Sequence, residues 1–192
     1  MNKQYLYLEN ILLYSIILIP IFLITGPLVP EILMNISNLI FLFLVIKKRD
    51  FTYFFNKYSI FFLLFFIYIN LNSLFSDNVL ISLKSSFFYF RFYLMSLSIW
   101  YLFENKKNFH KFFFKLFLLV QVILVLDGII QFFFNKNIFG WEKLHPDRVS
   151  SFFGDEMIMG SYLFKFLPIT ISLFFLNFLE KKKNKYIFFF FF

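Results

Sequence analysis

Six long apolar segments constrain this 192-residue chain more than any other feature. An α-helix needs about 20 apolar residues to cross the hydrocarbon core of a bilayer, and six windows approach that length. They cover residues 5–25, 28–46, 59–75, 85–103, 112–134 and 157–179. Because a chain in lipid must satisfy its backbone hydrogen bonds internally, we expect an all-α, polytopic bundle of membrane-spanning helices.

The residue content excludes several classes of protein. Hydrophobic residues make up 60% of the chain and 37 residues are Phe, so the apolar surface exceeds what one soluble core can bury. With no Cys, the chain forms no disulfide, thiolate nucleophile or Cys-ligated metal site. Lys and Arg outnumber Asp and Glu by 19 to 11, but they lie between apolar segments and form no continuous basic face. We therefore expect a bilayer and not a nucleic acid as the partner.

The loop cations predict the orientation, because Lys and Arg are retained on the cytoplasmic side. Thirteen of them flank the segments on one side: Lys3, Lys47, Lys48, Arg49, Lys57, Lys106, Lys107, Lys111, Lys115, Lys181, Lys182, Lys183 and Lys185. The opposite loops hold only Lys84, Lys136, Lys143 and Arg148. The amino terminus is therefore expected in the cytoplasm and the loop 135–156 on the outside. No small-residue cleavage site follows the first segment, which is typical of a signal anchor.

The last seven residues, 186–192, are again apolar and include five consecutive Phe residues. Seven residues are too few to cross a bilayer. They predict the start of a seventh segment, and residues 1–192 are accordingly expected to be a single, truncated membrane domain.

Three charged residues lie deep inside the predicted helices: Arg91, Asp127 and Lys165. At the helical rise of 1.5 Å per residue, all three lie roughly 10 to 12 Å below the outer surface. A charge in the membrane needs a partner or water, so we expect Asp127 close to Arg91 or Lys165 in a cavity open to the outside. Alternatively, Asp127 only neutralises one of these cations between helices, and Lys165 extends its ammonium to the outer head groups.

The stretch HPDRVSSFFGDEMIMGSY, residues 145–162, uses residue types that the chain avoids elsewhere. Pro146 ends any helix before Arg148, whose forked guanidinium can bind two oxygens of a phosphate or pyrophosphate. Gly154 permits a tight approach before the last helix, and Gly160 leaves a notch in that helix for a ligand or a neighbouring helix.

Each of these residues has a simpler interpretation. Asp155 and Glu156 can be acids that favour the amino terminus of a helix. His145 can be a solvated loop residue, and Arg148 can contact lipid head groups. The two histidines, His110 and His145, are too far apart in the predicted topology to form a metal site.

Two motifs carry a resemblance to a known family. DGIIQFFF, residues 127–134, ends one predicted helix, and RVSSFFGDEMIMGSYL, residues 148–163, leads into the next after a short outward loop with Gly140. This arrangement resembles the amino-terminal half of the O-antigen ligase and O-antigen polymerase family. The family has an Asn-Pro or Pro-Asn pair where this chain has Asp155 and Glu156.

The resemblance implies transfer of a glycan from an undecaprenyl-pyrophosphate carrier to an acceptor sugar or lipid. The reaction takes place at the outer face of the bacterial inner membrane, during lipopolysaccharide or other polysaccharide biosynthesis, without metal or cofactor. Arg148 would steady the departing pyrophosphate, with electrostatic stabilisation as the main catalytic effect. The substrate-binding residues implied are Arg148, Arg91, Lys165, Asp127, Gln131, Gly154 and Gly160. In the family the general base is a His in a later outward loop, beyond Phe192, so we expect this chain alone to be inactive.

Two other functions remain open. A carrier or flippase for a lipid-linked sugar or an anionic solute would use the same charged residues as a pathway. Such a protein usually has polar residues in both halves of its helices and an internal repeat, and the sequence shows neither. The third possibility is a non-catalytic fragment whose helices only pack together.

Overall fold

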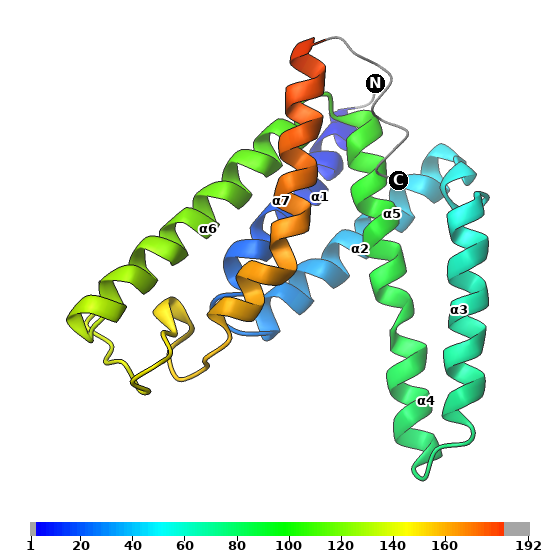
Figure 1. Ribbon diagram of the computed structural model, residues 1–192. Helices are drawn as coiled ribbons and strands as arrows, with labels where there is room; N and C mark the ends of the chain where they lie inside the picture. Colours follow the sequence, from blue (N-terminus) through cyan, green and yellow to red (C-terminus); the bar gives the residue numbers. More distant parts are fainter. Residues whose placement is uncertain (1–2, 183–192) are drawn as a thin grey trace. The chain divides into compact units, whose positions relative to one another are not determined.

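The computed structural model describes the backbone of residues 3–182 and the side chains of residues 5–178. Within this part of the chain the regular structure is helical, without a named strand. Its α-helices are α1 (Lys3–Phe22), α2 (Leu28–Lys48), α3 (Lys57–Ser73), α4 (Val79–Phe88), α5 (Phe90–Asn105), α6 (Phe109–Phe134) and α7 (Met159–Lys182) (Figure 1). Two short 3-10 helices, η1 (Thr52–Phe54) and η2 (Ser151–Phe153), lie in the connections. The predicted all-α class is confirmed.

Four of these helices are long and apolar enough to cross a bilayer: Tyr5–Phe22, Leu28–Lys48, Phe109–Phe134 and Met159–Phe178. The predicted window 59–75 corresponds to α3, which has 17 residues and falls short of that length. The predicted seventh segment, residues 186–192, lies outside the described residues. Length and composition therefore support four crossings directly, two fewer than predicted.

The window 85–103 differs most from the structure, which has two helices there instead of one. α4 begins at Val79, six residues before the window, and α5 follows it after Tyr89. Tyr89 keeps right-handed helical angles (φ −62°, ψ −21°), so the two helices continue in nearly the same direction (Figure 1). A helix continues as long as its backbone hydrogen bonds continue, whatever the hydropathy of its side chains. The helical structure therefore begins before the apolar window, at Val79, and includes Lys84.

The chain packs as two compact units. Unit 1 comprises Met1–Ile16 and Glu31–Lys106, and unit 2 comprises Ile17–Pro30 and Lys107–Phe192. Unit 1 thus contains the first part of α1, nearly all of α2, and α3 to α5. Unit 2 contains the end of α1, the first residues of α2, α6, α7 and the loop between α6 and α7.

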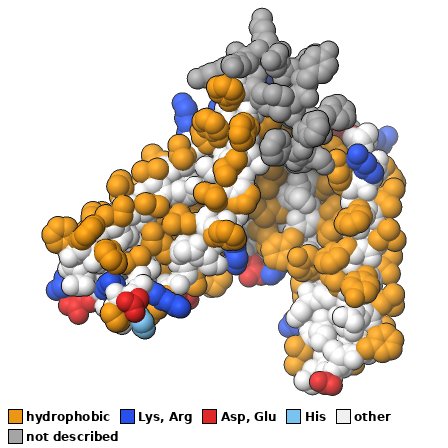
Figure 2. Space-filling model, in the orientation of Figure 1, with side chains coloured by type: hydrophobic (Ala, Val, Ile, Leu, Met, Phe, Trp, Pro, Cys, Tyr) orange, Lys and Arg blue, Asp and Glu red, His pale blue; other side chains and the backbone are white. Residues whose placement is uncertain are grey.

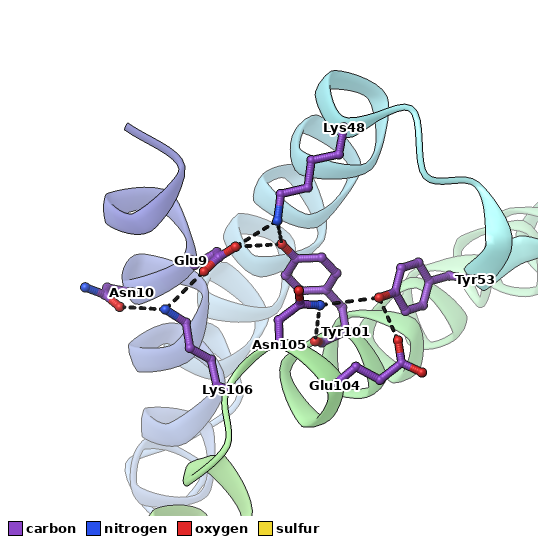
Figure 3. A network of polar contacts seen from close by, with 8 residues as sticks. All are labelled: Glu9, Asn10, Lys48, Tyr53, Tyr101, Glu104, Asn105 and Lys106. Atoms are coloured by element: carbon purple, nitrogen blue, oxygen red, sulfur yellow. Dashed lines mark hydrogen bonds and ion pairs between the residues drawn. The ribbon is translucent and has the colours of Figure 1, made fainter. Parts of the chain in front are cut away.

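In unit 1 a buried carboxylate joins three helices (Figure 3). Glu9 of α1 is only 3% exposed. It accepts from the Lys48 ammonium at 2.9 Å, from the Tyr101 hydroxyl at 2.9 Å and from the Lys106 ammonium at 3.0 Å. A buried charge is stable only when it is paired and hydrogen-bonded, and these contacts supply both. The network therefore fixes the start of α1 against the carboxyl-terminal ends of α2 and α5.

A second carboxylate, Glu104, extends the polar network (Figure 3). It accepts from the Tyr53 hydroxyl at 2.7 Å and from the indole N–H of Trp100 at 2.8 Å. Tyr53 lies in η1, outside the apolar helices. Burial and then the hydrogen bond to Glu104 raise its pKa above the usual range, so its hydroxyl keeps its proton.

α3 and the α4–α5 column form a helical hairpin within unit 1 (Figure 1). The α3 helix begins at an Asn56 cap, whose side chain accepts from the backbone N–H groups of Tyr58 and Ser59. The rings of Phe62 and Tyr93 stack with their centroids 4.3 Å apart. Side-chain stacking of this kind holds α3 and the α4–α5 column together.

In unit 2, α6 and α7 pack around a small apolar core. The core consists of Val120, Leu124, Phe153, Met159 and Tyr162. The Tyr162 hydroxyl donates to the carbonyl oxygen of Pro20 at 2.8 Å, which attaches the end of α1 to α7. The loop between α6 and α7 contributes Phe153 to this core, so the loop is part of the fold and not an appendage.

Candidate functional site in the loop after α6

The loop turns back sharply at the end of α6. Asn135 ends the helix with φ 58°, the left-handed conformation common at helix ends. The backbone N–H of Asn137 donates to the carbonyl of Trp141 at 3.0 Å, and Gly140 supplies the positive φ of 84° that this turn needs. Gly140 and Trp141 thus lie in a turn that points the rest of the loop back toward α6.

Asp127, one of the predicted charged residues, holds the loop from within α6. Its side chain is fully buried, at 0% exposure. Its Oδ2 accepts from the Ser151 hydroxyl at 2.6 Å, and its Oδ1 accepts from the backbone N–H of Ile138 at 2.9 Å. Asp127 thus binds both segments of the loop, the one that leaves α6 and the one that returns toward α7.

Gln131 lies one turn further along α6, on the same face as Asp127. Its Oε1 accepts from two successive backbone N–H groups, those of Ser150 at 2.9 Å and Ser151 at 2.8 Å. Ser151 has φ 52°, a left-handed conformation that costs a non-glycine residue energy. The contacts to Asp127 and Gln131 offset this strain and fix the Ser150–Ser151 turn.

Two further residues complete the anchor. The Asn137 side chain donates to the carbonyl of Ser151 at 3.2 Å. Gly154 ends η2 with φ 61°, and a Cβ there would meet open space, so its conformation and not crowding favours glycine. The tight approach predicted at Gly154 is therefore not seen within the described chain, and the glycine instead provides a turn with positive φ before α7.

Arg148 lies in the exposed part of this anchored loop. Its guanidinium forms no hydrogen bond or ion pair with any residue that the structure describes. Its backbone N–H donates to the carbonyl of His145 at 3.4 Å, and the His145 ring accepts from the N–H of Asp147 at 3.4 Å. His145 therefore caps a small turn, in line with its simpler interpretation as a loop residue.

Charged side chains gather at this end of unit 2, beside helix sides that are mostly apolar (Figure 2). The exposed ones in the loop are Lys136, Glu142, His145, Asp147, Arg148, Asp155 and Glu156. Lys136 and Glu142 neutralise each other at 3.2 Å. Arg148 is thus an exposed cation on an ordered backbone, unpaired among the described residues and in a position to bind an anion.

The predicted ion pair of Asp127 is not formed with Lys165, and this expectation is corrected. Asp127 is satisfied by neutral donors, while Lys165 is exposed on α7 and has no partner among the described side chains. Arg91 belongs to unit 1, where its guanidinium pairs with Glu31 and its carbonyl accepts from Asn38 at 2.9 Å. Equal depth predicted a shared cluster, but depth does not determine which face of a helix a residue occupies.

The structure also bears on two interpretations of the start of α7. The helix begins at Met159, and Asp155 and Glu156 lie just before it, outside its first turn. A Cβ at Gly160 would meet nothing within 4 Å, so no helix of the described chain fills the predicted notch. The close approach occurs instead at Gly128, where a Cβ would lie 2.6 Å from the terminal methyl of Met159.

Sequence reasoning missed Ser150, Ser151 and Asn137 as parts of this site. The signal was available only in part: a Ser-Ser pair that follows Arg148 after one intervening residue, Val149. In the described chain, no three His, Asp or Glu side chains lie close enough together to hold a metal ion. The chemistry that the loop offers is therefore anion binding by Arg148, supported by an internal hydrogen-bond network.

The apolar helices indicate a membrane protein, and the loop gives it one ordered polar site. Neither a protein-family model nor a curated protein nor a solved structure matches this chain. The function of the site has to be argued from its own residues.

Proposed function

We propose that this chain belongs to a membrane glycan transferase of the O-antigen ligase or polymerase type. In this proposal Arg148 binds the pyrophosphate of an undecaprenyl-linked glycan while the glycan passes to an acceptor sugar or lipid. The reaction lies at the outer face of the bacterial inner membrane.

One observation carries the proposal. The two segments that resemble the family, residues 127–134 and 148–163, are separated by the 13 residues of the loop 135–147, and they fold into one hydrogen-bonded structure. Asp127 and Gln131 of the first segment bind Ser150 and Ser151 of the second. These contacts hold the segment that contains Arg148 against the first segment, which is the arrangement that a site built from both segments requires.

The geometry around Arg148 suits a leaving pyrophosphate. The guanidinium has a planar fork of donors that can bind two phosphate oxygens at once. Its backbone is held two residues before the fixed Ser150–Ser151 turn, so little ordering is needed when a ligand binds. Positioned donors that face developing charge are usually the largest contribution to catalysis of group transfer.

The other predicted site residues divide into two groups. Asp127 and Gln131 are fully buried, and their side chains are used in holding the loop, so we assign them a positioning role. Arg91, Lys165, Gly154 and Gly160 remain predictions as substrate contacts. Lys165 is exposed on the helix that follows the loop and belongs to the same unit as Arg148, whereas Arg91 belongs to unit 1.

We further propose six crossings, with α3 as the third and the α4–α5 column as the fourth. The amino terminus is then cytoplasmic and the Arg148 loop outside. Glu9 supports this arrangement, because its contacts bring Lys48 and Lys106, which belong to two of the three cation-rich connections, to one end of unit 1. A common location for these cations is what retention on the cytoplasmic side requires.

The test replaces Arg148 by Ala in the chromosomal gene of the native host. Lys136→Ala is the matched control, because it removes another exposed cation from the same loop. Surface glycan is measured by gel, and the lipid-linked precursor is measured with an impermeant label in intact cells. We expect Arg148→Ala to reduce surface glycan and to leave the precursor accumulating at the outer face, while Lys136→Ala changes neither.

The two readouts separate the transferase from the carrier. If the precursor accumulates at the inner face in the Arg148→Ala strain, movement across the membrane has failed and the carrier function replaces the transferase. If glycan and precursor are unchanged at equal protein level, Arg148 has no part in the mechanism and contacts only head groups.

A further inference from the structure

A separate set of donor groups lies on the α4–α5 column of unit 1. An open depression of about 400 Å³ there is lined by Lys84, Ser85, Phe88, Tyr89, Arg91 and Phe92. Lys84 and Arg91 are seven residues apart, or two helical turns, which places them on one face of the column. The depression is therefore built by consecutive turns of a single helical column and does not depend on the position of unit 2.

Every polar side chain in this lining can donate a hydrogen bond, and none carries negative charge. Lys84 is exposed, and neither its ammonium nor the hydroxyls of Ser85 and Tyr89 have a partner among the described residues. The Nε atom of Arg91 is buried and has no partner there either. Four groups that donate without acceptors of their own favour an anionic ligand with several oxygens.

The net charge limits which anion fits. Arg91 pairs with Glu31, the carboxylate that contacts this lining, so one positive charge is already balanced. Lys84 remains as the uncompensated cation. A single net positive charge matches one phosphodiester better than a pyrophosphate, which carries more negative charge.

The surroundings indicate where the anion comes from. Leu80, Ile81, Phe87 and Phe92 are large apolar residues exposed on the same two helices, the first two at 85% and 68%. Aromatic and apolar surface next to cationic donors is typical of the border between acyl chains and head groups. A free ion in water would gain nothing from these apolar neighbours.

We propose that the Lys84–Arg91 depression binds the phosphodiester head group of an anionic membrane lipid. The ammonium of Lys84 and the hydroxyls of Ser85 and Tyr89 contact the phosphate, and the acyl chains lie along the exposed apolar face of α4. One lining residue, Arg91, is also a predicted substrate contact of the proposed transferase. Lys84, Ser85 and Tyr89, the residues substituted in the test, take no part in that reaction, and Arg148 belongs to the other unit.

The experiment measures lipid binding to the purified full chain in detergent by native mass spectrometry. Phosphatidylglycerol, which has an anionic phosphodiester, and phosphatidylcholine, in which a choline cation balances the phosphate, are added in equal amounts. A third arm adds inorganic phosphate to the phosphatidylglycerol sample. Lys84→Gln removes the uncompensated cation, and Lys57→Gln removes an exposed lysine at the start of α3 as the matched control.

We expect phosphatidylglycerol to bind in preference to phosphatidylcholine. Lys84→Gln should lower its affinity about fivefold, the effect of one surface cation on anionic lipid. The double substitution Ser85→Ala with Tyr89→Phe removes only neutral donors. It should also lower the affinity for phosphatidylglycerol, without changing phosphatidylcholine binding. Lys57→Gln should bind phosphatidylglycerol as the unmodified chain does.

Two outcomes overturn the proposal. Equal binding of the two lipids, or equal losses in Lys84→Gln and Lys57→Gln, would show that the depression does not select an anionic head group. Displacement of phosphatidylglycerol by inorganic phosphate at a comparable concentration would show that the site binds free phosphate and not a lipid.

Discussion

The Oδ2 atom of Asp127 lies 2.6 Å from the Oγ atom of Ser151, although 24 positions separate the two residues in the chain. This contact, with the one from Asp127 to the Ile138 backbone, ties the loop to the helix that precedes it. A carboxylate without access to water must be matched by donors, so the loop and Asp127 stabilise each other. The position of the Arg148 backbone depends on the contact between Asp127 and Ser151.

The first prediction concerns the hydrogen bonds that Asp127 accepts. Asp127→Leu keeps the branched shape of the side chain, removes the acceptor of the Ile138 N–H, and leaves the Ser151 hydroxyl only its longer contact to the Leu124 carbonyl, at 3.4 Å. It should lower the free energy of unfolding by about 3 kcal/mol, since each unsatisfied buried group costs roughly 1 to 3 kcal/mol. Asp127→Asn should cost less than about 1 kcal/mol, because its amide still accepts from Ile138 and can donate to Ser151.

Unfolding in mixed micelles gives the free energies, and trypsin cleavage within the loop reports its local order. Asp155→Leu serves as control, since Asp155 is exposed and has no partner among the described side chains. Equal effects of the Leu and Asn substitutions at position 127 would show that its hydrogen bonds do not hold the loop.

The second prediction concerns Glu9. Glu9→Gln leaves Lys48 and Lys106 without their shared counterion and should lower the free energy of unfolding by about 3 kcal/mol, the lower end for a broken buried pair. The two ammonium groups are partly exposed, at 27% and 18%, which keeps the loss at that end of the range. Glu104→Gln, at an exposed carboxylate of the same network, should cost less than about 1 kcal/mol.

Thermal unfolding of the three proteins in detergent provides this comparison. A Glu9→Gln chain as stable as the Glu104→Gln chain would mean that the three helix ends associate without the buried carboxylate.

The third prediction is topological. Single cysteines can be placed in this Cys-free chain at positions 107 and 143. Because most loop cations lie on the side of Lys107, an impermeant thiol reagent applied to intact cells should label position 143 and not position 107. Labelling at 107 alone would reverse the proposed orientation, and disrupted cells, in which both positions should react, provide the control for accessibility.

The fourth prediction separates charge from shape at Arg148. Lys keeps the charge but loses the planar fork that binds two phosphate oxygens, so Arg148→Lys should impair transfer nearly as much as Arg148→Ala. Loss of one charge-assisted contact of about 1.5 to 3 kcal/mol corresponds to a rate lower by roughly ten- to a hundredfold. The rate of surface glycan formation in the edited strains measures both. Full activity of Arg148→Lys would reduce the role of the residue to that of a simple positive charge.

The sequence by itself determined the helical class and the approximate helix positions. The windows 28–46 and 112–134 fall on α2 and α6, which begin or end within three residues of the predicted bounds. The reason is physical: a segment in lipid has no water to satisfy its backbone, so apolar composition and length alone favour a helix. The use of glycine at the two separate turns that contain Gly140 and Gly154 was also predictable, because both positions have positive φ, which favours glycine.

Only the tertiary structure decided which polar residues meet. Asp127 was predicted to need a partner, but the partner is Ser151 and not Lys165, and Glu9 lies 92 positions from Tyr101. Hydropathy gives the depth of a side chain along its helix and says nothing of the direction in which it points. That direction depends on how neighbouring helices rotate and pack, and on where a loop folds back, which are properties of side-chain contacts distributed over the whole unit.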